Sequence, residues 1–171
     1  MTNHHRRELP KLPQARMYLK SAQWGIDAMV DNKLGGYAFR LHLIGILASL
    51  RAVQHALLGH ERTLSEAHKR VIDEWQRRTP RTVPELAFIE TARNQILKWG
   101  AFRAYAAATE LGEGMPVERA PTEDEHVYEL VYYDEQGNRR DLEQAIRAGI
   151  RWCEVELSAI EDLLPPVYAP E

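Results

Sequence analysis

Apolar residues recur at steps of three and four along most of the chain, which is the spacing of one face of an α-helix. The clearest run predicts a long helix that follows Gly35-Gly36 and ends near Gly59. Its apolar positions are Phe39, Leu43, Ile46, Leu47, Leu50, Val53, Leu57 and Leu58. An earlier run, with Met17, Ile26, Met29 and Val30, predicts a helix that starts at Pro13, because proline fits the first turn of a helix.

Three further helices are predicted from local start and stop signals. The first runs from about Ser65 to the turn at Thr79-Pro80. The second starts at a capping box formed by Thr82 and Glu85, and its apolar stripe continues through Trp99 and Phe102 until the glycines at 112 and 114. The last begins at Asp141, which can cap it together with Gln144, and Pro165-Pro166 is expected to end the fold.

One segment favours β-structure. Residues 127–133 are rich in Val and Tyr, and the turn signal Gln136-Gly137-Asn138 follows them. One hairpin cannot build a sheet core, so helix packing must bury the apolar faces. The sequence therefore predicts a mainly α fold, a bundle of four to five helices with a small β-hairpin at 126–140 before the last helix. We expect one domain over 1–171, with a flexible arm at 1–12 and an acidic linker at 113–125.

Composition narrows the class of protein. The chain has 171 residues, of which 44% are hydrophobic and 27% charged, with a net charge of −3. Its longest uncharged apolar stretch, Leu41 to Leu50, is half of the ~20 residues that cross a bilayer, so a soluble cytoplasmic protein without a membrane partner is expected. Residues 110–135 hold nine acids and one Arg, whereas 60–103 hold nine Lys/Arg and six Asp/Glu. One interpretation is that both segments are solvent-exposed faces without a special role. The alternative is that the basic segment binds a polyanion while the acidic segment stays away from it.

Most familiar catalytic patterns are missing from the sequence. The single cysteine, Cys153, lies on an apolar stripe and is expected to be buried and inert. There is no HExxH, no GxSxG, no GxGxxG and no P-loop, so no metal site and no cofactor are predicted. His60 and Glu61 with His68 are interpreted as a polar cluster at helix ends. His55, one turn after Arg51, is interpreted as a partly buried bundle histidine, with a catalytic role as the alternative.

One helical segment carries an unusual set of polar residues. Glu90, Asn94 and Lys98 are spaced i, i+4, i+8 and line one side of the predicted helix, with Arg93 beside them. Asparagine forms helices poorly, so we expect Asn94 to hydrogen-bond another helix or a partner. The alternative is an ordinary polar face.

A helical bundle whose later helix carries Arg-Asn-x-x-x-His resembles the HEPN superfamily of bacterial and archaeal defence and toxin–antitoxin proteins. The resemblance covers roughly residues 35–165 and places the arginine at Arg93 and the asparagine at Asn94. It implies a homodimer in which arginine and histidine cleave RNA without metal. Lys98 occupies the histidine position here. Metal-free cleavage needs proton transfer near pH 7, and a lysine would need its pKa lowered by about three units to do this.

We therefore expect a non-enzymatic HEPN-like protein, a homodimer that binds RNA or protein in bacterial stress or defence through Glu90, Arg93, Asn94 and Lys98. One alternative is a metal-independent ribonuclease that uses Arg93 with another histidine such as His55. A second is a helical interaction scaffold without a ligand. The Arg93-Asn94 segment is expected at the two-fold interface, because several aromatic residues lie near it; the alternative is that they fill the monomer core. These residues are Trp75, Trp99, Phe102 and Tyr105.

Overall fold

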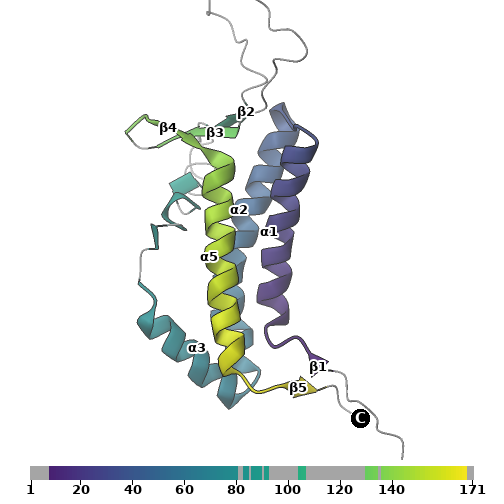
Figure 1. Ribbon diagram of the computed structural model, residues 1–171, viewed down its shortest axis with the longest axis vertical. Coiled ribbons are helices and arrows are strands. Elements are labelled where there is room, and N and C mark those ends of the chain that lie inside the picture. Colours follow the sequence, from purple (N-terminus) through teal and green to yellow (C-terminus); the bar gives the residue numbers. More distant parts are fainter. Residues whose placement is uncertain are drawn as a thin grey trace, which may run out of the picture.

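The computed structural model describes residues 8–80, 83–84, 86–89, 91–92, 104–106, 130–134 and 136–168. Over these residues the protein is mainly helical (Figure 1). Its helices are α1 (Pro13–Asp31), α2 (Gly36–Gly59), the 3-10 turn η1 (Glu61–Thr63), α3 (Glu66–Arg78) and α5 (Leu142–Leu163). Residues 84, 86–89 and 91–92 are helical as well. The short strands are β1 (Glu8–Leu9), β2 (Ala104–Ala106), β3 (Leu130–Tyr133), β4 (Arg139–Asp141) and β5 (Val167–Tyr168).

Among the described residues, three long helices make the bundle. In Figure 1, α1, α2 and α5 run side by side, and α3 lies across the lower end of α5. The inner faces of the three helices form one buried apolar core, to which α3 adds Ile72 and Trp75. All the apolar positions predicted for α2 are buried except Leu58, which is half-buried. Cys153 belongs to this core, and burial raises the pKa of its thiol to about 12, as expected for an inert cysteine.

The helix ends follow the local signals in the sequence. α1 begins at Pro13, and α2 begins at Gly36, whose φ of +53° is a backbone conformation that suits glycine. The side chain of Ser65 accepts the backbone N–H of His68 at the start of α3. Asp141 accepts the backbone N–H of Gln144 at 2.8 Å at the start of α5. Both side chains cap the first turns of their helices, and the sequence predicts the cap at Asp141 and the helix start near Ser65.

α1 and α2 approach closely at Gly25. A Cβ added there would lie 2.7 Å from Cγ1 of Ile46, a side chain in the buried core of α2. We expect Gly25→Ala to lower the free energy of unfolding by about 1–2 kcal/mol, because the overpacking outweighs the gain in helix propensity. Chemical denaturation followed by circular dichroism measures this change. Gly59→Ala is the matched control, since a Cβ there meets nothing within 4 Å, and equal effects at both sites would contradict the prediction.

The predicted hairpin is confirmed. β3 and β4 pair antiparallel, with Tyr132 opposite Arg140, and Gly137 takes a φ of +81° in the turn. β2 adds a third strand by pairing antiparallel with β3, Tyr105 opposite Val131. The prediction that the preceding helix continues to residue 112 is therefore wrong at 104–106. These residues find hydrogen-bond partners on β3, and this tertiary pairing overrides the helical preference of the segment.

The predicted flexible arm is also wrong where it can be compared, at residues 8–12. β1 pairs with β5, Leu9 opposite Val167, so the fold continues past Pro165-Pro166. The Lys11 ammonium group donates to the main-chain oxygens of Glu161 and Leu164, at 2.9 and 2.8 Å, and Leu12 is fully buried. The last carbonyls of a helix lack partners within it, which explains why they bind a lysine. The predicted linker at 113–125 lies outside the described residues, as do residues 1–7.

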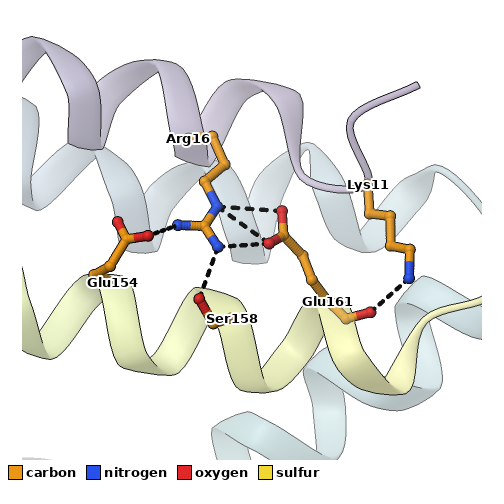
Figure 2. A network of polar contacts seen from close by, with 5 residues as sticks. All are labelled: Lys11, Arg16, Glu154, Ser158 and Glu161. Carbon is orange, nitrogen blue, oxygen red and sulfur yellow. Dashed lines mark hydrogen bonds and ion pairs between the residues drawn. The ribbon is translucent and has the colours of Figure 1, made fainter. Parts of the chain in front are cut away.

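Arg16 ties α1 to α5 (Figure 2). Its guanidinium donates to the Glu161 carboxylate at 2.5–3.2 Å, to Glu154 at 2.5 Å and to the Ser158 hydroxyl at 3.0 Å. The three partners are four and three residues apart, so they share one side of α5. The Glu161 hydrogen bonds are the largest cause that raises the pKa of Arg16.

Glu61 caps α1 from a distant part of the chain. Its side chain is fully buried, and its Oε1 accepts the backbone N–H groups of Gln14 and Ala15 at 2.7 and 3.1 Å. Leu12, the residue in the N-cap position, has no side chain that could do this. His60 Nδ1 lies 3.6 Å from the other carboxylate oxygen. The buried Glu61 side chain therefore accepts hydrogen bonds from two N–H groups that have no partner within α1. It also lies at the positive end of the dipole of this helix.

One stretch, Gly36–Thr63, is long and apolar enough to cross a membrane by length and composition, with a mean hydropathy of 1.4. The core helix of a soluble protein has the same properties, and the inner face of α2 is buried in the bundle.

Candidate functional site

The residues singled out by the sequence lie outside the part of the chain that the structure describes. Glu90, Arg93, Asn94 and Lys98 are all in this group. The helical residues at 86–89 and 91–92 lead directly up to Arg93. The proposed motif face therefore stays a prediction, and the described residues just before it are where a site can be built.

A cavity of about 610 Å³ opens between these helical residues and the β3–β4 hairpin. This volume is typical of sites for small molecules, which measure ~300–1,000 Å³. The helical side supplies Pro84, Ala87, Phe88, Thr91 and Ala92, and the hairpin side supplies Tyr132, Tyr133, Asp134, Gln136 and Arg140.

Aromatic rings form the apolar part of the cavity. The ring centroids of Phe88 and Tyr132 are 4.6 Å apart, and the two planes are inclined by 44°. Phe88 is brought there by the helical segment and Tyr132 by β3, both half-buried at the edge of the core. Burial raises the pKa of the Tyr132 hydroxyl, so this group stays protonated at neutral pH. The rings offer a surface on which a flat ligand can stack.

Asp134 organises the polar end of the cavity. Its carboxylate accepts the backbone N–H groups of Gln136 and Asn138, at 3.1 and 2.8 Å, and so holds the turn. It also accepts from the Arg140 guanidinium at 2.9 Å. The hydrogen bond from the Asn138 backbone is the largest cause that lowers the pKa of Asp134. At neutral pH this end therefore presents an ionised carboxylate paired with an arginine.

This arrangement is suited to binding rather than to proton transfer. A general acid or base works best with a pKa near the working pH. The pKa of Asp134 is shifted down and that of Tyr132 is shifted up, so both move away from neutrality. Arg140 serves as a hydrogen-bond donor.

The histidines take positions that correct one prediction and confirm another. His55 is exposed on α2 and does not line the cavity, so its interpretation as a partly buried histidine is wrong. His60, Glu61 and His68 do lie at helix ends, as expected, and the side chains of His60 and Glu61 are 3.6 Å apart. His68 Nε2 donates to the main-chain oxygen of Lys11 at 3.0 Å, and its Nδ1 lies 2.8 Å from the Ser65 hydroxyl. Within the described ranges, no three His, Cys, Asp or Glu residues gather in a group that could hold a metal ion.

Trp75 does not support the expectation that the aromatic residues near the Arg-Asn segment form an interface. It is buried in the monomer, and its indole N–H donates to Glu156 on α5 at 2.6 Å. For this residue the alternative, that the aromatics fill the core, is correct. Trp99 and Phe102 lie outside the described residues, and the Arg93-Asn94 interface stays a prediction.

The cavity is not predicted by the sequence. Its signals were present, since Phe88 precedes the Arg-Asn pair and Tyr132-Tyr133 ends the predicted strand. Only the fold brings them together.

No protein-family model, curated protein or solved structure matches this chain.

Proposed function

We propose that this protein is a soluble, cytoplasmic and non-enzymatic binding protein, HEPN-like in architecture and homodimeric, that acts in bacterial stress or defence by binding single-stranded RNA. The observation that carries the proposal is the aromatic cavity beside the segment that leads to Arg93 and Asn94. Its expected ligand is an unpaired base.

The chemistry of the cavity supports a base as the ligand. Proteins that bind single-stranded RNA stack bases on aromatic side chains, at ~1–3 kcal/mol per base. Phe88 and Tyr132 provide such rings, and Arg140 and Gln136 offer hydrogen-bond donors at the rim. Arg93 and Lys98, which follow the helical residues of the cavity along the chain, are the residues expected to bind the phosphates.

The residues favour binding of RNA without its cleavage. Lys98 stands where the resemblance expects a histidine, and the cavity pairs a charged Asp134 with Arg140. The metal-independent ribonuclease that uses Arg93 is kept as an outcome of the test, and so is a scaffold without a ligand.

The test is binding of a fluorescein-labelled, mixed-sequence single-stranded RNA, followed by fluorescence anisotropy in EDTA. We expect binding at micromolar protein, weakened about tenfold or more by Phe88→Ala, since one stacking contact is lost. Tyr168→Ala is the matched control, because Tyr168 is an exposed aromatic on β5 and its loss should leave the affinity unchanged.

Three results would contradict the proposal. Absence of binding to the wild-type protein would favour the scaffold. Equal weakening by Phe88→Ala and Tyr168→Ala, with circular dichroism spectra like that of the wild type, would show that the cavity is not the site. RNA cleavage in EDTA that disappears in Arg93→Ala would favour the ribonuclease.

A further inference from the structure

The outer surface of α1 and α2 carries large apolar side chains that the core does not use. On α2, Tyr37, Leu41 and Ile44 are four and three residues apart, so they share one face of the helix, and they are 81%, 56% and 40% exposed. On the adjoining α1, Trp24 is 81% exposed and Met17 is 53% exposed. We call these five residues the outer apolar face.

The dimer needs Trp24 and Met17 of α1 as well as the α2 residues to reach the size of a specific interface. A buried aromatic side chain covers ~150–250 Å², so the exposed parts of Tyr37, Leu41 and Ile44 amount to roughly 300 Å², and Trp24 and Met17 add a similar area. An α2–α2 contact alone would bury about 600 Å² in two copies. With the two α1 residues it would bury about 1,200 Å², the lower end of specific interfaces.

Small residues continue the same face of α2 toward its C-terminal end. Gly45 and Ala48 are exposed, and Ala52 is half-buried. A Cβ added at Gly45 would meet nothing within 4 Å, so packing inside the monomer does not require glycine there. A glycine inside a helix costs ~1 kcal/mol relative to alanine, which calls for another reason for its presence. Close approach of a second helix is such a reason.

The large and small residues are arranged so that the face complements itself. Suppose that two α2 helices pack antiparallel about a two-fold axis between residues 44 and 45. The numbers of two opposing residues then always add up to the same value as 44 and 45. Tyr37 then lies opposite Ala52 of the partner subunit, Leu41 opposite Ala48 of the partner subunit, and Ile44 opposite Gly45 of the partner subunit. Each large side chain meets a small one at every level, as an isologous interface requires.

The arginines of α2 lie at one edge of this arrangement. Arg40 and Arg51 are on the same side of the apolar stripe. In the same register Arg40 lies opposite Ser49 of the partner subunit and within two residues of Arg51 of the partner subunit. These like charges weaken the contact at that edge, and the apolar stripe must outweigh their repulsion.

We propose that the outer apolar face is the interface of a homodimer, in which α2 packs antiparallel against α2 of a second copy about a two-fold axis at Ile44 and Gly45. The inference rests on the homodimer of the proposed function but not on its RNA ligand. It places the dimer contact on α2 rather than at Arg93 and Asn94.

Sedimentation velocity of the full chain tests the interface. We expect a dimer at 10–100 micromolar for the wild-type protein, as is common for specific interfaces of this size. Leu41→Glu should give a monomer over this range with an unchanged circular dichroism spectrum. Val155→Glu is the matched control, because Val155 is 65% exposed on α5, and it should remain dimeric.

Gly45→Leu separates loss of the dimer from loss of the fold. The monomer has room for the new side chain and gains helix propensity, so its thermal stability should not fall. The leucine would meet Ile44 of the partner subunit, and we expect the dimer to dissociate at least tenfold more readily.

A disulfide test fixes the register. Ile44→Cys places two thiols next to the two-fold axis, so mild oxidation should link the copies almost completely, whereas Val155→Cys should not be linked beyond the background. The native Cys153 is buried and stays outside this reaction.

A monomeric wild-type protein would overturn the proposal, and binding of that monomer to neutral lipid vesicles would show that a bilayer covers the face. So would a dimer that survives Leu41→Glu but is lost in Asn94→Leu, which would move the interface to the Arg-Asn segment. RNA anisotropy with the Leu41→Glu monomer keeps the two proposals apart, because failure of one measurement leaves the other standing.

Discussion

Replacing Glu61 by alanine is expected to lower the free energy of unfolding by about 3 kcal/mol. The carboxylate is fully buried and accepts the N–H groups of Gln14 and Ala15, so its loss leaves two donors of the α1 N-terminus without partners. Each unsatisfied buried group costs ~1–3 kcal/mol, and the vacated space adds to the cost. Urea denaturation followed at 222 nm measures the change.

Two further variants identify the cause. Glu61→Gln keeps an oxygen that can accept the two N–H groups, and we expect it to restore at least half of the lost stability. Glu66→Ala removes an exposed glutamate at the start of α3 and should cost less than ~1 kcal/mol. Similar losses in Glu61→Ala and Glu66→Ala would show that the buried cap does not stabilise the fold.

The second large effect is expected at Arg16. Arg16→Ala should cost about 2 kcal/mol, because it breaks a bidentate, partly buried contact between α1 and α5 and leaves Glu161 without its cation. A double-mutant cycle with Glu161→Ala should give a coupling energy of at least ~1 kcal/mol. Thermal and urea unfolding of the four proteins supply the values.

Arg77→Ala is the control for this cycle. Arg77 forms an ion pair with Glu74 three residues away on the same helix, and its side chain is 72% exposed. Pairs of this kind contribute ~0.5 kcal/mol or less. If Arg16→Ala lowers the free energy of unfolding no more than Arg77→Ala does, the contact in Figure 2 contributes no more than an exposed ion pair, and the prediction is wrong.

The sequence predicts the helices well because their ends depend on neighbouring residues. Pro13, Ser65 and Asp141 act within one turn of their own positions, so the sequence alone places them correctly. The hairpin follows for the same reason, since Gly137 and the strand residues on either side are local signals.

The errors concern contacts between distant parts of the chain. Residues 8–12 follow no helical pattern, yet the pairing of β1 with β5 and the contacts of Lys11 order them. The helical period of the neighbouring residues predicts a helix where β2 lies, but β3 supplies the hydrogen bonds that make this segment a strand. Such partners are more than 20 residues away, and no local pattern contains them.

One part of the candidate site can be predicted from the sequence and another part cannot. The Arg-Asn motif is a pattern within one helix, so the sequence could single it out. The cavity requires Phe88 and Tyr132, 44 residues apart, to meet, and only the fold brings that about. The outer apolar face was within reach of the sequence, because Tyr37, Leu41 and Ile44 give α2 a second apolar side that one core does not explain.

The pairing of β1 with β5 joins a segment before α1 to a segment after α5, since Glu8 lies opposite Tyr168. A ribosome releases the residues of β5 only after those of α5, so β1 has no partner until α5 has been synthesised. Until then the main-chain oxygens that hold Lys11 do not exist in their final place. The nascent chain can therefore assemble α1 and α2 as a local helical pair before β1 pairs with β5.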